Sequence, residues 1–479
     1  MLVCRRSIKN LSPLMRAQSF SPTSTVLSKG REPLEPELDA IVVGANVAGA
    51  CTARNLSQRG LRVALVERQP GPEVGTRSCG DGIERYQFEK LGIKVPRGEF
   101  ILREVPVAYL YSPDRRTRFR GFGAGIAIDR FPLNQHLLAQ AVDAGVELVD
   151  STEAQVPLLE DGRVVGIQYR SRHGGDSGRM HAPVTVDATG WRGQLRRAMP
   201  ADWPIAEAIP THETAIAYRE ERRRGEPVDE LLVEATLDYE ISPNGVYWMA
   251  DRSETLVNVG IGMQRVPGVP NPRSVIRGRV LPLYPGLEGT EVIRSGGGII
   301  PNRRPIDCPV ANGLIAVGDA ACQVNPLTGS GIGASMYASD LAAEAVTVAL
   351  EATRTPSTED LFPYARSYQT GYGRDQAAYQ VLRLALQALT NDQLNRLMGS
   401  DTISEEDLVT AARTGKLALS FGAKMKAATK LMGEPRLFRA LARMQRRMEA
   451  ARQLYSNYPE HPEGLEGWRA RGARLFGGR

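Results

Sequence analysis

The sequence lacks the features that mark membrane-spanning, disulfide-bonded and zinc-binding proteins. No stretch of its 479 residues approaches the roughly 20 apolar residues that a membrane-spanning helix needs. The five cysteines are odd in number and far apart, and the five histidines form no metal-binding motif. We therefore expect a reducing compartment, no disulfide framework and no metal.

Acidic residues are absent from the first 31 positions, which contain six Lys and Arg and many Ser and Thr. This composition resembles an organellar transit peptide. A disordered tail, or a start codon called upstream of Met15, explains it equally well. We therefore treat residues 1–37 as an extension, disordered or targeting, and begin the fold near Leu38.

Acidic residues are also few near the end of the chain, where residues 411–479 hold fifteen Lys and Arg against five Asp and Glu. Apolar residues are interleaved with these charges, which fits helices lying on a core or on a membrane surface. No RNA- or DNA-binding motif accompanies them. We expect no nucleic-acid partner, a cytoplasmic location and peripheral contact with a membrane.

Residues 39–67 read as a strand, a glycine turn, a helix and a second strand. Asp39–Val43 is a short apolar run, small residues follow at helical spacing until Gly60, and Leu61–Val66 is apolar again. Glu67 then stands where a carboxylate accepts the two hydroxyls of an adenosine ribose. This order predicts a βαβ unit that binds a dinucleotide.

The turn of this unit departs from the G-x-G-x-x-G pattern at Asn46, where the second glycine belongs. A Cβ at this position crowds the pyrophosphate, but Asn tolerates positive φ, so we interpret Asn46 as a mild replacement. The candidate nucleotide-binding residues are Gly44, Ala45, Asn46, Gly49, Glu67 and Arg68.

Two later apolar runs, Val184–Gly190 and Gly313–Asp319, end in A-T-G and in G-D. Together they resemble motifs of FAD-dependent oxidoreductases of the glutathione-reductase-like fold. That resemblance implies FAD as the cofactor, with Gly190 and Gly318 at the site and Asp319 on the ribityl chain.

A glycine-rich turn at residues 325–333 follows the G-D motif and precedes a predicted helix. Such a turn aims unpaired backbone N–H groups at whatever lies before the helix, which suits the negative charge of reduced flavin. Pro326, Gly329, Gly331 and Ile332 are therefore candidate flavin-binding residues.

Six motifs are spread over the chain beyond residue 38. They are S-C-G-D-G-I (78–83), I-D-R (128–130), P-N-R-R-P (301–305), V-G-D-A-A (317–321), N-P-L-T-G-S-G-I (325–332) and L-Y-S-N-Y-P (454–459). In these the chain resembles the geranylgeranyl reductase family, especially the archaeal digeranylgeranylglycerophospholipid reductases. The resemblance implies an FAD-dependent reductase that saturates C=C bonds of polyprenyl lipids by hydride transfer from reduced flavin.

The family resemblance also implies site residues. Cys79 matches the loop cysteine beside the isoalloxazine, and a buried structural thiol is the alternative interpretation. Arg130, Arg303 and Arg304 either orient flavin phosphates or a lipid head group, or make surface ion pairs. The candidate catalytic residues are Cys79, Gly80, Asp81 and Trp248, and Cys79, Gly80 and Arg130 are also candidates for cofactor binding.

One segment departs from the family, which carries P-x-x-Y-x-W-x-F-P where residues 243–251 read P-N-G-V-Y-W-M-A-D. Trp248 is kept, but Val246 and Ala250 replace two aromatic residues. Alternate residues of a strand share a face, so these three side chains project together and Tyr247 points the other way. We expect a substrate pocket that is wider or differently shaped.

The fold class is mixed α/β. We predict a discontinuous Rossmann-type FAD-binding lobe (38–200 and 296–350), an antiparallel-sheet substrate lobe (201–295) and a helical, basic C-terminal region (351–479). Only one dinucleotide fingerprint is present, so the electron donor stays open between ferredoxin and NAD(P)H. A flavin-dependent monooxygenase or halogenase and a non-catalytic prenyl-binding protein remain the alternative functions.

Overall fold

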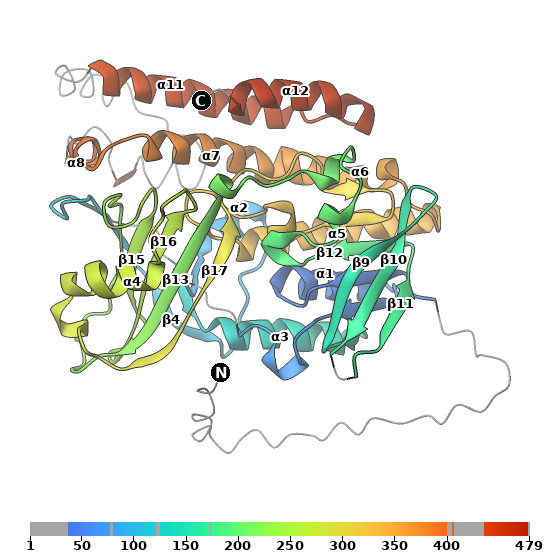
Figure 1. Ribbon diagram of the computed structural model, residues 1–479, viewed down its shortest axis with the longest axis horizontal. Coiled ribbons are helices and arrows are strands. Elements are labelled where there is room, and N and C mark those ends of the chain that lie inside the picture. Colours follow the sequence, from blue (N-terminus) through green and yellow to red (C-terminus); the bar gives the residue numbers. More distant parts are fainter. Residues whose placement is uncertain are drawn as a thin grey trace. The chain divides into compact units, whose positions relative to one another are not determined.

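A six-stranded sheet lies at the centre of residues 38–479 of the computed structural model (Figure 1). The structure describes residues 37–76, 80–120, 125–172, 174–399, 405–406 and 435–477. The strand order is β18-β19-β12-β1-β2-β8, and every pair is parallel except β18 with β19. The strands are β1 (Ala40–Val43), β2 (Val63–Val66), β8 (Glu147–Val149), β12 (Val184–Asp187), β18 (Val310–Ala311) and β19 (Leu314–Ala316). The mixed α/β fold and the βαβ unit are thereby confirmed.

Helix α1 (Val47–Ser57) connects β1 to β2 and packs against α3 (Arg130–Asp143) and α5 (Ile332–Ala352). Its residues facing the interior are small, as the sequence predicts, so neighbouring backbones approach closely. A Cβ built at Gly49 would lie 1.7 Å from the carbonyl oxygen of Gly44. Glycine at this position lets the helix start directly behind the turn.

Two smaller antiparallel sheets flank this core. One has the order β11-β10-β9, and its strands β10 and β11 form a hairpin at the turn that the letters H-G-G-D-S-G (173–178) suggest; His173 itself lies outside the described residues. The other has the order β3-β7-β4. Their strands are β3 (Gly82–Glu84), β4 (Ile101–Val105), β7 (Gly125–Ile128), β9 (Thr152–Glu160), β10 (Arg163–Ser171) and β11 (Ser177–His181).

A seven-stranded sheet contains strands at the three apolar runs of the predicted substrate lobe, residues 214–218, 231–237 and 255–262. Its order is β17-β13-β16-β15-β14-β5-β6, and its neighbours are antiparallel except β14 with β5. The strands β5 and β6, and residues 296–301 of β17, come from segments that we assigned to the FAD-binding lobe. The strands are β5 (Tyr109–Tyr111), β6 (Arg118–Arg120), β13 (Thr214–Arg223), β14 (Val233–Thr236), β15 (Val246–Asp251), β16 (Leu256–Gln264) and β17 (Val292–Pro301).

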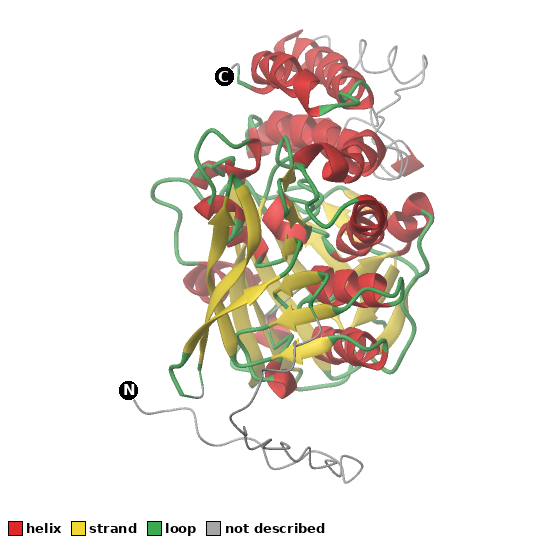
Figure 2. Cartoon of the chain, turned by 90° about the vertical axis from the view of Figure 1, so that its right-hand side faces the viewer, coloured by secondary structure: helices red, strands yellow, loops and turns green. Residues whose placement is uncertain are grey.

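Helices make up the C-terminal part of the described chain and lie on one side of the sheets (Figures 1 and 2). They are α6 (Thr358–Tyr368), α7 (Arg374–Gln387), α8 (Asn391–Gly399), α11 (Pro435–Ser456) and α12 (Leu465–Phe476). The shorter helices α2 (Arg85–Leu91) and α4 (Pro272–Val275) precede them in the chain. The sequence also suggests helix caps at Ser404, which precedes E-E-D, and at Gly433; both lie outside the described residues.

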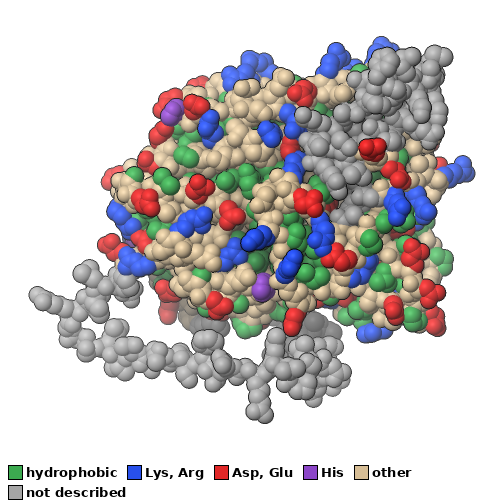
Figure 3. All heavy atoms as spheres, turned by 180° about the vertical axis from the view of Figure 1, so that it is seen from behind, with side chains coloured by type: hydrophobic (Ala, Val, Ile, Leu, Met, Phe, Trp, Pro, Cys, Tyr) green, Lys and Arg blue, Asp and Glu red, His purple; other side chains and the backbone are tan. Residues whose placement is uncertain are grey.

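The basic helix α11 turns its apolar side chains inward. Leu437, Met444 and Met448 are buried, whereas Arg443 and Arg446 are exposed. On the molecular face in Figure 3, basic and acidic side chains are interspersed. None of the helices in the described ranges combines the length and apolar character needed to cross a bilayer.

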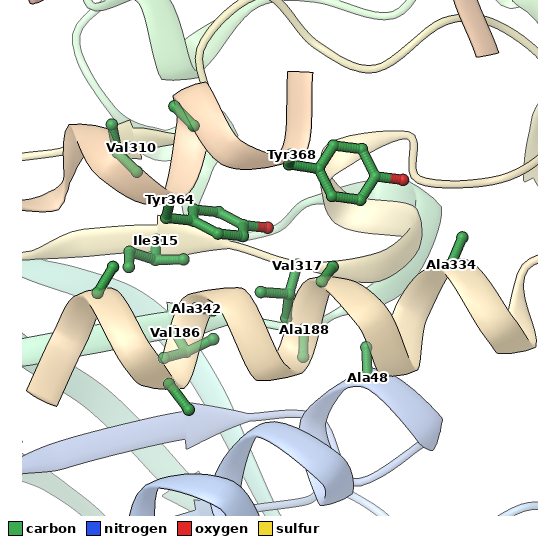
Figure 4. Close-up of a cluster of buried hydrophobic side chains, with 14 of the residues drawn as sticks. Ala48, Val186, Ala188, Val310, Ile315, Val317, Ala334, Ala342, Tyr364 and Tyr368 are labelled. Carbon is green, nitrogen blue, oxygen red and sulfur yellow. The ribbon is translucent and has the colours of Figure 1, made fainter. Parts of the chain in front are cut away.

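One large apolar core joins α1, α5 and α6 to the parallel sheet. Ala48 points at α5, which passes between α1 and the rings of Tyr364 and Tyr368 (Figure 4). The same core continues into the C-terminal helices, where Tyr455 and Trp468 are fully buried with ring centroids 5.0 Å apart. Tyr455 and Tyr458 of the L-Y-S-N-Y-P motif therefore pack within this core.

Replacement of this tryptophan tests whether α12 belongs to the core. Trp468→Ala removes a buried ring and should lower the free energy of unfolding by about 3–5 kcal/mol. Phe438→Ala, at a side chain that is 40% exposed, should change it by less than about 0.5 kcal/mol. Denaturant unfolding measures both values. If Trp468→Ala lowered the free energy of unfolding as little as Phe438→Ala does, the packing of α12 in the core would be contradicted.

Candidate active site

A cavity of about 900 Å³ lies where the parallel sheet, the seven-stranded sheet and the C-terminal helices meet. Segments hundreds of residues apart line it. The predicted site residues that line this cavity are Gly44, Asn46, Glu67, Arg68, Gly80, Asp81, Arg130, Gly190, Trp248, Asp319, Pro326, Gly329, Gly331 and Ile332. Cys79 lies outside the described residues.

Three predicted residues lie behind the cavity wall. Ala45 is buried and donates its N–H to Glu67 Oε2 at 2.8 Å. Gly49 faces the carbonyl of Gly44, and Gly318 faces Ala48, whose Cβ would be 2.7 Å from a Cβ built at residue 318. These residues shape the site by close packing, without lining the cavity.

Two glycines with positive φ bring the A-T-G and G-D segments to the turn after β1. Gly44, at φ 102°, leaves no space for a side chain, since a Cβ would lie 2.5 Å from the carbonyl oxygen of Ala188. Gly318, at φ 64°, lies directly against α1. The next residue, Asp319, thus reaches the cavity beside the start of α1.

Glu67 fixes this turn from the other side. Its carboxylate accepts the N–H of Ala45 at 2.8 Å and that of Gln69 at 3.0 Å, and the side chain is buried. A carboxylate held by two backbone donors at the end of β2 is ready to accept further hydrogen bonds from a ligand in the cavity.

Asn46 fits the turn for a different reason from the one that we predicted. Its φ is −76°, so tolerance of positive φ is not needed and that explanation is wrong. Asn46 is the N-cap of α1 in extended conformation, and its Oδ1 accepts a hydrogen bond from Asn134 Nδ2 of α3 at 3.2 Å. Its side chain makes no capping hydrogen bond to α1, and the bond from α3 holds it in place instead.

The C-G-D loop, of which Gly80 and Asp81 are described, is held by buried ion pairs. Asp81, at φ 61°, accepts from Arg252 and pairs with Arg219 at 3.1 Å. Burial raises the pKa of Asp81, although both arginines act in the opposite direction. The network continues through Glu221 and Asp129, which share Arg294 at 2.7 and 3.0 Å.

Arg303 and Arg304 make ion pairs inside the protein. Arg303 pairs with Glu207 at 2.6 Å and Glu213 at 3.1 Å, and Arg304 pairs with Asp307. Both guanidinium groups are largely shielded from solvent, so the interpretation as surface ion pairs is wrong. Neither arginine lines the cavity, and we assign both to the internal packing of the P-N-R-R-P segment.

The turn at residues 325–333 presents backbone groups to the cavity. Asn325 Oδ1 accepts the N–H of Leu327 at 2.9 Å, and the N–H of Gly329 bonds to the carbonyl of Asn325 at 2.8 Å. Gly331 is the N-cap of α5 and provides no side-chain cap. The first turn of a 21-residue helix therefore faces the cavity with its backbone donors.

The predicted wall is present on β15. Val246, Trp248 and Ala250 line the cavity, while Tyr247 and Met249 are buried in the core on the other face of the sheet. The Trp248 ring lies across Gly260, where a Cβ would approach it to 2.0 Å, and its Nε1 donates to Asn258 at 3.1 Å. The small neighbours of Trp248 leave space on both sides along the wall.

Several lining residues were not predicted from the sequence. They are Glu84, Gln87, Arg219, Tyr239, Arg383 and the glycine run Gly296–Gly298. The three consecutive glycines were a visible signal for close approach in a strand. The others come from β3, α2, β13, the segment after β14 and α7, and carried no local pattern that marks a site.

The comparisons with known proteins agree with this geometry. Residues 39–94 match the family described as FAD dependent oxidoreductase. The chain is 34% identical over 436 residues to the digeranylgeranylglycerophospholipid reductase of Sulfolobus acidocaldarius, covering 91% of this chain and 96% of that relative. The chain belongs to the digeranylgeranylglycerophospholipid reductase family.

Other members of this family, and solved structures, extend the comparison. Digeranylgeranylglycerophospholipid reductase 2 of Methanopyrus kandleri is 28% identical, over 78% of this chain and 92% of the relative. The fold is similar to that of a geranylgeranyl bacteriochlorophyll reductase-like protein from Thermoplasma acidophilum (TM-score 0.70, 23% identity, covering 85% and 99%). It is also similar to a myxobacterial chondrochloren halogenase (TM-score 0.58, 19% identity, covering 83% and 98%).

This membership makes the protein an FAD-dependent oxidoreductase, and the cavity fits the cofactor. Its wall contains the start of α1, the buried carboxylate of Glu67, Asp319 and the donor-rich start of α5. Helix starts and their preceding turns suit the pyrophosphate and the anionic flavin.

Loss of the Glu67 charge tests this fit. Glu67→Gln keeps an acceptor for Ala45 but replaces charge-assisted hydrogen bonds, so FAD should bind roughly tenfold more weakly, about 1.4 kcal/mol. Fluorescence titration of the apoprotein with FAD measures this change. Glu73→Gln, at an exposed carboxylate nearby, should bind as the wild type does; equal affinity in both variants would refute the role of Glu67.

Proposed function

We propose that this protein saturates C=C bonds in the polyprenyl chain of a lipid, with FAD bound in the cavity. Two observations support the proposal together: the family to which the chain belongs, and one cavity that combines nucleotide-binding features with an apolar wall. The names of the relatives refer to a digeranylgeranylglycerophospholipid. The altered wall at Val246 and Ala250 leaves the identity of the lipid open.

In this proposal, residues at opposite ends of the cavity hold different parts of FAD. Gly44, Asn46, Glu67 and Arg68 bind the adenosine and pyrophosphate, and Arg130 provides a cation at the start of α3. Gly190, Asp319 and the residues Pro326, Gly329, Gly331 and Ile332 hold the flavin end. Bound and reduced, FAD supplies a hydride to a C=C bond.

Gly80, Asp81 and Trp248 form the reaction region between the flavin end and the substrate wall. Asp81 keeps the loop in place through Arg219 and Arg252. Cys79 remains a candidate at this loop. Trp248 provides a flat apolar surface against which a prenyl chain lies.

The remaining lining is suited to a chain of hydrocarbon. Apolar residues of α8, of α11 and of the segment that follows β14 line the cavity, including Leu237, Leu397, Met398, Leu441 and Met444. An unactivated double bond needs accurate placement in a site that excludes water, more than it needs strong polarisation. The apolar lining provides both.

The electron donor and the membrane contact are also proposals. We propose that ferredoxin or NAD(P)H reduces FAD, since the chain has a single dinucleotide fingerprint. We further propose that the protein draws its lipid from a membrane by peripheral contact. Exposed arginines of α11, such as Arg443 and Arg446, support contact with anionic lipids.

A single-turnover experiment tests the function. The FAD-loaded protein is bleached by dithionite under anaerobic conditions and mixed with a polyprenyl lipid. The flavin absorbance should return as the lipid gains two hydrogens per double bond, measured by mass spectrometry. Oxygen-dependent hydroxylation would indicate a monooxygenase, and a purified protein that neither contains nor binds FAD would indicate a prenyl carrier.

Restoring bulk on the wall tests the substrate assignment. Ala250 projects into the cavity beside Trp248, so Ala250→Phe should narrow the range of prenyl chains that are reduced. The kcat/KM for the longest or bulkiest chain should fall roughly tenfold or more relative to a short chain, for about 1–3 kcal/mol of lost fit. Unchanged selectivity across a series of chain lengths would contradict the wall assignment.

A further inference from the structure

Saturation of a double bond requires a proton as well as a hydride, and the cavity holds six acidic side chains that could donate it. Five of them are engaged by other groups or lie elsewhere in the cavity, so we do not assign them as the proton donor. Asp81 and Glu234 form ion pairs with arginines, and Glu67 is bound by two backbone N–H groups. Asp319 is assigned to the flavin end, and Glu153 lies beside Thr152, whose N–H bonds to the carbonyl of Glu67.

The sixth, Glu84, has a different environment. It ends β3, precedes α2 as its N-cap residue and lines the cavity together with Ser330 of the glycine-rich turn. Its carboxyl accepts a hydrogen bond from the amide of Gln87. Within the described parts of the chain, no arginine or lysine forms an ion pair with Glu84.

Gln87, which donates a hydrogen bond to the carboxyl of Glu84, lies directly against the start of α5 with Phe88. A Cβ built at Gly333 would be 3.4 Å from Gln87 Oε1 and 3.4 Å from the ring of Phe88. The carboxyl of Glu84 is thus placed at the flavin end of the cavity, beside the turn that we assign to the isoalloxazine. An acid at this position is near the place where a double bond must lie to receive a hydride.

The surroundings of Glu84 favour its protonated form. Burial raises the pKa of Glu84, and hydrogen bonds from Tyr86, Gln87 and Ser330 oppose this only in part. The titratable groups that face it are Tyr86 of α2 and Tyr372 of the π-helix η10 (Gln369–Gly373). Burial raises the pKa of both phenols well above the usual value, so both stay neutral.

Phenols and a lysine lie near Glu84. Tyr372 and Tyr379 are close enough to Tyr86 to raise its pKa. Lys90 Nζ lies 5.7 Å from the centroid of the Tyr372 ring and donates to the Tyr379 hydroxyl at 3.4 Å. The Lys90 side chain is 20% exposed and pairs with Asp375, so its charge is balanced by that carboxylate.

We propose that Glu84 is the proton donor in double-bond saturation. The inference rests on the proposed function. The π bond breaks and two C–H bonds form: one carbon receives a hydride with its electron pair from reduced FAD, and the other receives the proton of Glu84. The alkene is reduced, the flavin is oxidised, and the Glu84 carboxylate regains a proton from water.

Glu84→Gln tests the proposal because the amide keeps the shape of the side chain and has no acidic proton. FAD content and bleaching by dithionite should match the wild type. Reoxidation of the reduced flavin by a polyprenyl lipid should slow by about 10²-fold or more. The wild-type rate should fall as pH rises through the pKa of Glu84, and this dependence should vanish in the variant.

Two further measurements separate chemistry from structure. Infrared spectra of the FAD-loaded protein should contain the carbonyl band of a buried protonated carboxyl group, and Glu84→Gln should remove that band without turnover. Glu84→Asp should recover part of the rate. Glu104→Gln, at an exposed carboxylate of β4, should behave as the wild type in every measurement.

The outcomes distinguish this inference from the function on which it rests. If the lipid fails to reoxidise the wild-type flavin, the proposed function and the assignment of Glu84 are both contradicted. If the lipid reoxidises wild type and Glu84→Gln at equal rates, only the assignment of Glu84 is overturned. Retention of the carboxyl band in Glu84→Gln would likewise show that another acid carries the proton.

Discussion

The close packing around the start of α1, at Gly44, Gly49 and Gly318, is the constraint on which the site depends. Gly44 touches the end of β12, Gly49 touches the turn before the helix, and Gly318 touches Ala48, each at a distance that a side chain would not allow. Because these contacts place the ends of β1, β12 and β19 together, the residues that follow each strand open into one cavity. This is the edge of a parallel sheet at which ligands bind in open α/β folds. The strand order of the parallel sheet thus brings the cofactor-binding segments after β1, β12 and β19 to one cavity.

A second constraint ties the C-G-D loop to the seven-stranded sheet. Asp81 comes from the loop, Arg219 from β13 and Arg252 from the turn after β15, and all three are buried. Burying such charges is costly, and removing one partner of a buried ion pair typically costs about 3–5 kcal/mol. The network therefore fixes the loop against the wall that carries Trp248. Glu84, two residues beyond the loop glycine Gly82, gains its position from the same arrangement.

Local pattern was sufficient for much of the fold and for one side of the site. Short apolar runs located β1, β2, β12 and β19, and alternation on β15 correctly separated Trp248 from Tyr247. The sequence did not reveal that β5 and β6 join the larger sheet, because strand pairing between distant segments leaves no local periodicity. Glu84 was missed for the same reason: its role depends on Ser330 and Tyr372, which only the folded chain brings near. The explanation of Asn46 by positive φ was wrong, and its actual partner, Asn134, could not be predicted because it lies on another helix.

The central claim is that one cavity holds the flavin and the prenyl chain side by side. A crystal structure of the protein with FAD and a polyprenyl lipid tests it most directly. We predict the isoalloxazine between the Gly80–Asp81 loop and the turn at residues 325–333, with the lipid chain along Val246, Trp248 and Ala250. Density for the lipid outside this cavity, or FAD away from Glu67 and Asp319, would contradict the account.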